Sequence, residues 1–142
     1  MRISRDQMLM EMAITASKRG TCLRRKIGAV IAVEGRVISI GYVGAPSGFP
    51  HCTPETCSPG NPCNNTVHAE SNAIAAAARA GIATLSARMY TTVSPCLKCA
   101  QLIIASGIIA VDYLEEYRDI EPVEYLRKAG IFCDKLLFQM EL

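Results

Sequence analysis

Two short groups of residues in the middle of the chain have the types and spacing of a metal site. Cys96 and Cys99 are three positions apart at the expected start of a helix, so their sulfur atoms share one helical face. A helix N-terminus lowers thiol pKa values and favours the thiolates that metals bind. His68, at the expected start of another helix, adds an imidazole. Two thiolates, one imidazole and an open fourth position predict a catalytic zinc site.

Glu70 follows His68 by two positions and is predicted to lie beside the metal without binding it. Residues two apart on a helix do not share a face, so Glu70 is not expected to be a ligand. A carboxylate in this place can take a proton from the water that the zinc activates. A lone Cys-x-x-Cys also fits a redox pair. His-x-Glu followed by Pro-Cys-x-x-Cys, with both groups at helix starts, is the much more specific signature of zinc deaminases.

The composition indicates one soluble globular domain over residues 1–142, with 50% hydrophobic and 20% charged residues. The net charge is +2 without a long basic run, which argues against nucleic-acid binding and is compatible with a small anionic ligand. Asp6 and Glu11 interrupt the N-terminal apolar residues, and no membrane-spanning stretch follows. We therefore expect no membrane partner and a cytoplasmic location, where the 7 cysteines favour metal binding over disulfides.

The elements that must position these groups follow from caps, turns and apolar patterns. A Ser4–Gln7 capping box predicts a first helix, and Ser94 and Pro95 are interpreted as the N-cap and first residue of a later one. Residues 44–66, rich in proline and glycine, fit no regular element. Strands alternating with helices in the second half predict an α/β fold with a largely parallel sheet. The predicted helices are 4–18, 67–80, 95–106 and 122–128, and the predicted strands are 27–33, 36–42, 88–93, 108–113 and 131–138.

Residues 5–138 resemble the deoxycytidylate deaminases of the cytidine-deaminase-like superfamily, through segments 22–31, 41–48, 51–52, 66–74, 90–99 and 113–117. The resemblance implies a three-layer α/β/α fold in which helices enclose a five-stranded mixed sheet. It implies the hydrolytic deamination of dCMP to dUMP, with zinc held by His68, Cys96 and Cys99 and with Glu70 as the proton shuttle. It also implies that Tyr117 stacks on the pyrimidine. The alternative is that Tyr117 is a partly buried aromatic residue of a loop with no role in binding.

The resemblance extends to regulation and assembly. It implies a homo-hexamer that dCTP activates and dTTP inhibits at a separate site, with Mg²⁺ accompanying the triphosphate. One departure is that Val43 stands where the family usually has an asparagine that is expected to hydrogen-bond the nucleotide near its sugar. The sugar contact and the allosteric response therefore stay open. The expected allosteric loop contains Gly41, Tyr42, Gly44, Pro46 and Gly48.

Four further cysteines indicate a second, structural zinc site. Cys22 precedes the first strand, whereas Cys52, Cys57 and Cys63 lie in the irregular segment, which a metal would order. The resemblance supports this expectation, since some phage members of the family hold a structural zinc with cysteines that match Cys22 and Cys52. His51 is an alternative ligand, and free buried thiols are the alternative to a site.

A nucleoside monophosphate requires cations near the cleft. Arg24, Arg25 and Lys26 precede the first strand, and Arg118 follows Tyr117. Guanidinium groups suit phosphate, while a solvated charged surface explains the same residues equally well.

Two other functions are weighed against this one. A nucleic-acid editing deaminase related to the tRNA adenosine enzymes shares the zinc motif, but the modest charge and the absence of Trp speak against it. A non-catalytic zinc module that senses dNTPs is disfavoured by the complete ligand set together with Glu70.

Overall fold

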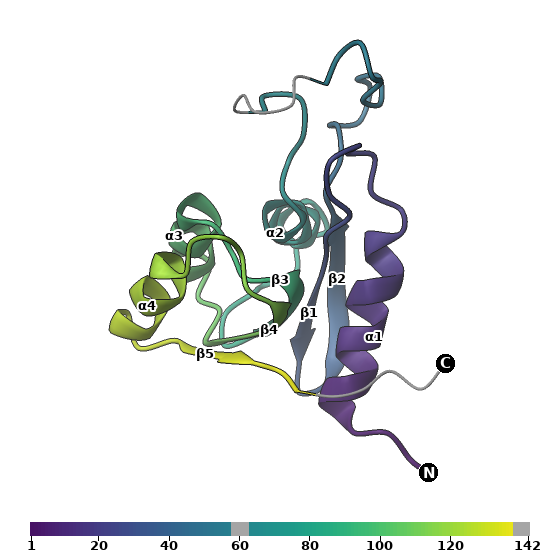
Figure 1. Ribbon diagram of the computed structural model, residues 1–142. Helices are drawn as coiled ribbons and strands as arrows, with labels where there is room; N and C mark the ends of the chain where they lie inside the picture. Colours follow the sequence, from purple (N-terminus) through teal and green to yellow (C-terminus); the bar gives the residue numbers. More distant parts are fainter. Residues whose placement is uncertain (58–62, 138–142) are drawn as a thin grey trace.

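A five-stranded mixed sheet forms the centre of the computed structural model, which describes residues 1–57 and 63–137 (Figure 1). Its strands are β1 (Gly28–Val33), β2 (Arg36–Tyr42), β3 (Arg88–Val93), β4 (Ala110–Glu115) and β5 (Phe132–Lys135). They lie in the order β2-β1-β3-β4-β5. β1 is antiparallel to β2 and β3, whereas β3, β4 and β5 run parallel. The predicted mixed sheet is confirmed, with its parallel part in the second half of the chain.

Helices cover both faces of this sheet, which confirms the three-layer α/β/α fold. α1 (Arg5–Ser17) packs on one face, against β1, β2 and β3. α2 (Ala69–Arg79), α3 (Leu97–Ala105) and α4 (Glu121–Lys128) lie on the other face (Figure 1). Among the described residues, no helix has the length and apolar character needed to cross a membrane.

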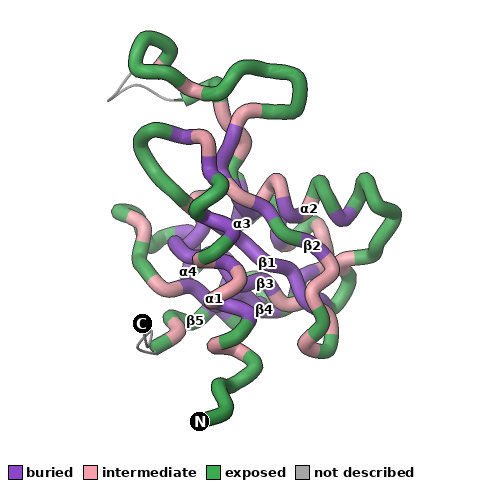
Figure 2. Tube along the Cα trace, turned by 90° about the vertical axis from the view of Figure 1, so that its right-hand side faces the viewer, coloured by how far each residue is buried: buried purple, intermediate pink, exposed green. Residues whose placement is uncertain are grey.

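β1 is apolar on both faces because each face is covered by a helical layer. Ala29 and Ile31 belong to the core under α2, α3 and α4, whereas Val30 and Ala32 belong to the core under α1. Alternate residues of a strand point to opposite faces, so a strand buried on both sides becomes a continuous apolar run. Figure 2 shows these strands as the buried centre of the molecule.

Two glycines let helices approach the sheet closely. A Cβ atom on Gly28 would overlap the backbone of α1, and one on Gly41 would overlap the backbone of α2 at Ala69 and Ala73. The hydroxyl of Ser39 donates a hydrogen bond to the Ala73 carbonyl and ties α2 to β2. These contacts fix the N-terminal turn of α2, which carries the predicted metal-site residues.

The two helices of the predicted metal site begin later than expected. His68 and Cys96 are the N-caps of α2 and α3, with extended backbones at φ −66°, ψ 153° and φ −75°, ψ 171°. The prediction that Ser94 caps the second helix and that Pro95 opens it was therefore wrong. The Ser94 hydroxyl instead accepts a hydrogen bond from the backbone N–H of Tyr117 at 2.7 Å. Neither N-cap side chain caps its own helix, so both are available to a metal.

Some of the remaining expectations differ from the structure in detail, although the bounds of β2 and β3 are as predicted. Ser4 caps α1 by accepting a hydrogen bond from the Gln7 N–H at 3.0 Å, but the Gln7 side chain donates to Glu11 and does not complete the predicted capping box. β4 begins and ends two residues after its predicted bounds, and β5 is shorter than the predicted 131–138. The last residue of that prediction, Phe138, lies outside the described residues.

The segment between β2 and α2 contains no helix or strand in its described parts, 43–57 and 63–68, as predicted for most of it. Within these described parts, an isolated β-bridge pairs Gly44 with Val67. The segment projects beyond the sheet and is largely exposed (Figures 1 and 2).

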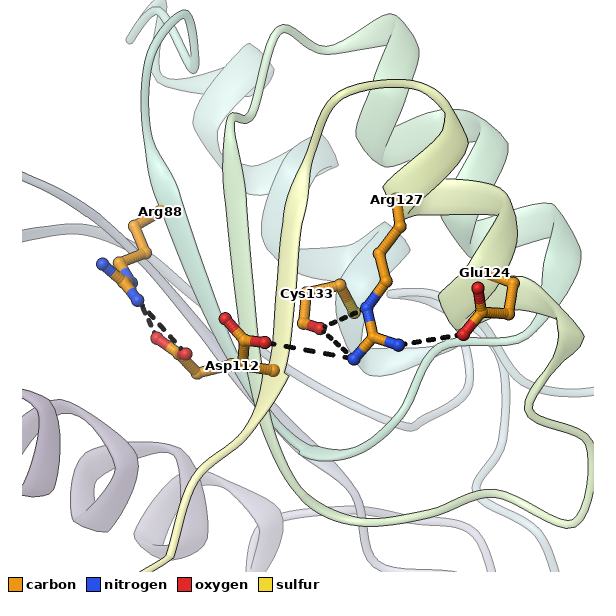
Figure 3. A network of polar contacts seen from close by, with 6 residues as sticks. Arg88, Asp112, Glu124, Arg127 and Cys133 are labelled. Carbon is orange, nitrogen blue, oxygen red and sulfur yellow. Dashed lines mark hydrogen bonds and ion pairs between the residues drawn. The ribbon is translucent and has the colours of Figure 1, made fainter.

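Two arginines stabilise the parallel half of the sheet away from this segment (Figure 3). Arg88 on β3 forms an ion pair with Asp112 on β4, with 2.6 Å between Nε and Oδ2. Arg127 on α4 donates to the backbone carbonyl of Cys133 on β5 and pairs with Glu124 at 2.9 Å. These contacts hold α4 and the last strands in register.

Candidate active site

The three predicted metal ligands converge at one point. The Nδ1 atom of His68 lies 3.4 Å from the Sγ atom of Cys96 and 3.4 Å from that of Cys99. Across residues 1–57 and 63–137, this is the one group of three or more His, Cys, Asp or Glu side chains whose ligand atoms all lie within 4.8 Å of one another. A tetrahedral zinc ion separates a sulfur and a nitrogen ligand by about 3.5 Å. The donor set and its spacing therefore fit zinc, bound through Nδ1 of the imidazole.

Two helix N-termini bring these donors together. His68 and Cys96 immediately precede α2 and α3, and Cys99 lies in the first turn of α3. The partial positive charge of a helix N-terminus stabilises a thiolate and favours the metal-binding form. The hydroxyl of Ser71, in the first turn of α2, lies 3.5 Å from the Cys99 sulfur and adds a hydrogen bond to it.

The two cysteine thiols interact through a hydrogen bond. This contact lowers the pKa of Cys96, and the same contact together with burial raises the pKa of Cys99. The hydrogen bond with Cys96 raises the pKa of His68. Cys96 is therefore the thiol that ionises first. A metal ion that binds both sulfurs and the imidazole releases the protons that remain, so metal binding is expected to strengthen as the pH rises.

Glu70 lies beside this cluster in the first turn of α2 and is 4% exposed. Burial raises the pKa of its carboxyl group, and hydrogen bonds from Cys99 and Thr91 oppose that effect. The Thr91 hydroxyl donates to Oε1 of Glu70 at 3.0 Å. A buried carboxyl group that accepts a proton more readily than a surface carboxylate is suited to general acid–base chemistry.

A cavity of about 520 Å³ opens over the cluster. Val43 lines it and is 5% exposed, so an apolar side chain stands where the family's asparagine was expected to meet a sugar. Lys26 is not part of the lining, because its ammonium group donates to the Gly20 carbonyl. The lining residues are Cys22, Arg24, Arg25, Ile27, Val43, Cys63, Thr66, His68, Ala69, Glu70, Ser94, Cys96, Tyr117 and Arg118.

Tyr117 forms one wall of the cavity together with two arginines. The guanidinium carbons of Arg25 and Arg118 lie 5.2 Å and 5.5 Å from the centre of the Tyr117 ring. Cations at this distance over an aromatic ring are attracted to its negative face. The wall therefore combines an aromatic surface with two positive charges, which matches a planar base that carries a phosphate.

The expected allosteric loop is tied to the start of α2. The Asn72 side chain donates to the Tyr42 carbonyl at 2.8 Å, and Gly44 exchanges two backbone hydrogen bonds with Val67. Pro46 accepts a hydrogen bond from the N–H of Phe49, next to Gly48, which adopts φ +91°. The loop therefore supports the backbone that leads to His68, and Val43 is its one side chain in the cavity lining given above.

Two of the four remaining candidate cysteines, Cys22 and Cys63, line the cavity. Burial raises the pKa of Cys52, and the neighbouring thiols of Cys22, Cys63 and Cys57 raise it further, so Cys52 lies among them. A hydrogen bond from Thr66 lowers the pKa of Cys63 to about 7. In the described part of the chain the four sulfur atoms do not converge as closely as the three donors of the first site.

The sequence did not identify three polar residues as parts of the site: Ser71, Thr91 and Ser94, the last of which was expected only as a helix N-cap. Each acts through a partner more than twenty positions away in the chain: Cys99, Glu70 and Tyr117 respectively. The one signal in the sequence was the pair of polar residues, Thr91 and Thr92, in the middle of β3.

One imidazole and two thiolates at paired helix N-termini, beside a buried carboxyl group, form the site of zinc-dependent nucleobase deaminases. Residues 3–115 match the family described as the cytidine and deoxycytidylate deaminase zinc-binding region, and the chain belongs to this family.

Individual relatives cover almost the whole chain. It is similar to ComE operon protein 2 of Bacillus subtilis, with 39% identity over 137 residues, which are 95% of this chain and 72% of that protein. It is similar to deoxycytidylate deaminase of Enterobacteria phage T4, with 34% identity over 164 residues, covering 87% of this chain and 85% of that protein. The fold is similar to the crystal structure of dCMP deaminase from cyanophage S-TIM5 in complex with dCMP and dUMP. That comparison has a TM-score of 0.87 and 28% identity, and covers 96% of this chain and 99% of the other.

Proposed function

We propose that this chain catalyses the hydrolytic deamination of dCMP to dUMP with release of ammonia. The observation that carries the proposal is the His68, Cys96 and Cys99 cluster, which lies beside Glu70 in one cavity. The similarity to a phage enzyme whose structure contains dCMP and dUMP supports the choice of substrate.

Zinc held by His68, Cys96 and Cys99 would supply Lewis-acid activation of a water molecule. Glu70 takes one proton from the water and passes it to N3 of the pyrimidine while the water oxygen forms a bond to C4. It then moves the remaining proton of that oxygen to the amino group, and the C4–N bond breaks to release ammonia. Because Glu70 is buried, its carboxyl group exchanges protons with the substrate in preference to bulk water.

The opposite wall is proposed to bind the rest of the nucleotide. Tyr117 stacks on the pyrimidine, since base–aromatic stacking accepts any planar base. Arg25 and Arg118 already lie over the Tyr117 ring, and Arg24 lines the same cavity. Their guanidinium groups would bind the 5′-phosphate, because their planar N–H donors match phosphate oxygens. Lys26 would add positive charge from outside the cavity.

A spectroscopic assay tests the function. Zinc-replete protein mixed with dCMP is expected to shift the ultraviolet absorption from that of cytosine to that of uracil. In the same assay, CMP tests whether the enzyme requires the deoxyribose sugar, and deoxycytidine tests whether it requires the 5′-phosphate. A short RNA tests the nucleic-acid alternative. An unchanged dCMP spectrum with zinc-loaded protein would overturn the proposal.

We also propose that Cys22, Cys52, Cys57 and Cys63 hold a second, structural zinc. Support comes from the electrostatic interaction of the Cys52 thiol with those of Cys22, Cys57 and Cys63, and from the lowered pKa of Cys63, which favours a thiolate ligand. Elemental analysis is expected to give about two zinc ions per chain, and Cys52→Ser is expected to lower the content to about one. About one zinc ion in the unaltered protein would contradict the second site.

Regulation and assembly are proposed from the family resemblance: a cytoplasmic homo-hexamer, activated by dCTP and inhibited by dTTP, with Mg²⁺ bound to the triphosphate. Deamination of dCMP measured with each triphosphate, with and without Mg²⁺, tests the regulation. Sedimentation of the protein with and without dCTP tests the assembly. If neither triphosphate changes the deamination rate, this protein, which has Val43 in place of the family's usual asparagine, is not regulated by them.

A further inference from the structure

A fully buried threonine in the middle of β3 lies directly against the proposed proton shuttle. Thr91 is 0% exposed, and its Oγ1 atom lies 3.0 Å from Oε1 of Glu70. The carbonyl of Val93 is a second acceptor at 3.0 Å. The hydroxyl is therefore held between the strand backbone and the carboxyl group, where bulk water does not compete for it.

Glu70 needs such a contact because its side chain is long. It extends from the first turn of α2 toward β3, and several rotatable bonds separate its carboxyl group from the backbone. A hydrogen bond on Oε1 fixes the plane of the carboxyl group and leaves the other oxygen for the cavity. Proton transfer depends on the position of that oxygen to within about 1 Å.

We propose that Thr91 is a positioning residue that holds Glu70 in its reactive orientation. This inference rests on the proposed deaminase function and names a residue outside the zinc motif that the reaction depends on. Outer-shell hydrogen-bond partners in metal sites typically change activity by about 10- to 100-fold when removed. A loss of this size in kcat is expected, because Thr91 contacts the carboxyl group and is not part of the cavity lining.

The neighbouring Thr92 offers a matched control. Successive strand residues point to opposite faces, so Thr92 faces α1 where Thr91 faces α2. Its hydroxyl accepts a hydrogen bond from the Gly28 N–H at 3.2 Å, and the residue is 9% exposed. Replacing either threonine by valine removes one buried hydroxyl group from β3 at nearly constant volume. Only one of the two replacements removes a contact with Glu70.

The experiment compares Thr91→Val, Thr91→Ser and Thr92→Val as zinc-loaded proteins. The measurements are kcat and KM for dCMP, the Kd for dUMP and the zinc content. Thr91→Val is expected to lower kcat about 10- to 100-fold, with KM, Kd and zinc content within about twofold of the unaltered protein. Thr91→Ser keeps the hydroxyl and is expected to restore kcat. Thr92→Val is expected to keep the full kcat.

Several outcomes would overturn the inference. These are a normal kcat in Thr91→Val, an equal loss in Thr92→Val, or a Thr91→Ser variant as impaired as Thr91→Val. If Thr91→Val does not fold, Thr91→Cys, a weak donor of similar size, is compared with Thr91→Ser, and equal kcat values would refute the role. An unaltered protein that neither converts dCMP nor binds dUMP would overturn the proposed function itself. An active protein that is insensitive at Thr91 would overturn only this inference.

Discussion

The backbone N–H of Tyr117 donates a 2.7 Å hydrogen bond to the side-chain oxygen of Ser94, which joins two strand ends at the mouth of the cavity. The N–H of Ser94 donates to the Glu115 carbonyl at 2.8 Å, just beyond the parallel pairing of β3 with β4. Ser94 precedes Cys96 by two residues. The sheet therefore sets the distance between the aromatic wall and Cys96.

Replacing Glu70 by glutamine is expected to lower kcat for dCMP by at least about 10²-fold, because the amide cannot carry the proton. Glutamine has the same size and still accepts the hydrogen bond from Thr91. The zinc content is therefore expected to stay unchanged. The ultraviolet assay and elemental analysis measure the two effects. Full activity in this variant would refute the proton-shuttle role.

Tyr117→Ala is expected to weaken dCMP binding by roughly 5- to 150-fold, since base–aromatic stacking contributes about 1–3 kcal/mol per base. Tyr117→Phe keeps the ring and is expected to bind dCMP nearly as well as the unaltered protein. The Kd for dUMP and the KM for dCMP measure the difference. Equal weakening by alanine and phenylalanine would show that the hydroxyl group, and not the ring, makes the contact.

Ser71→Ala is expected to lower zinc affinity by about 10- to 100-fold, because the Cys99 sulfur loses its hydrogen-bond partner at 3.5 Å. Competition with a chromophoric chelator measures the affinity. Ser106→Ala is the control, since Ser106 lies at the opposite end of α3 and its hydroxyl donates to the Ile103 carbonyl. Equal zinc affinity in all three proteins would show that the Ser71 hydroxyl does not support the thiolate.

Gly41→Ala and Gly28→Ala are expected to destabilise the protein by about 1–3 kcal/mol each, because each new methyl group overlaps a helix backbone. Gly41 faces α2, which carries Glu70 and follows His68, whereas Gly28 faces α1. Only Gly41→Ala is therefore expected to lower kcat as well as the thermal midpoint. A normal kcat in a destabilised Gly41→Ala variant would contradict this account of how the helix is positioned.

Thiol alkylation should follow the pKa order of the cysteines. A hydrogen bond from Thr66 lowers the pKa of Cys63 to about 7, and burial raises the pKa of Cys133 to about 12. The thiolate is the reactive form, so at pH 8 Cys63 is mostly reactive and Cys133 is almost entirely protonated. Mass spectrometry after brief alkylation at pH 8 is expected to find Cys63 modified and Cys133 intact. At pH 5 the rate at Cys63 should fall about 100-fold.

Zinc provides the control for that measurement. If Cys63 binds the proposed structural zinc, added zinc is expected to slow its alkylation, whereas a chelator is expected to restore the rate. If zinc does not affect the alkylation rate, Cys63 is reactive but does not bind the proposed structural zinc.

The sequence by itself determined the local parts of the site. His68, Glu70, Cys96 and Cys99 were recognised because helix starts and spacings of two or three residues are properties of short segments. The predicted bounds of β2 and β3 match the structure, the turn at Glu34 and Gly35 marks the start of β2, and resemblance to a family supplied the mixed sheet. These features depend on neighbours within one element.

Only the tertiary structure decided which distant side chains meet. Ser94 was expected to cap a helix, but the pairing of β3 with β4 brings it to Tyr117, and its oxygen accepts that hydrogen bond instead. Thr91 contacts Glu70 because strand alternation turns its side chain toward α2. Lys26, expected near the phosphate, bonds to Gly20. Such contacts depend on strand order, register and the face that each residue presents, and these are set by packing across the whole chain.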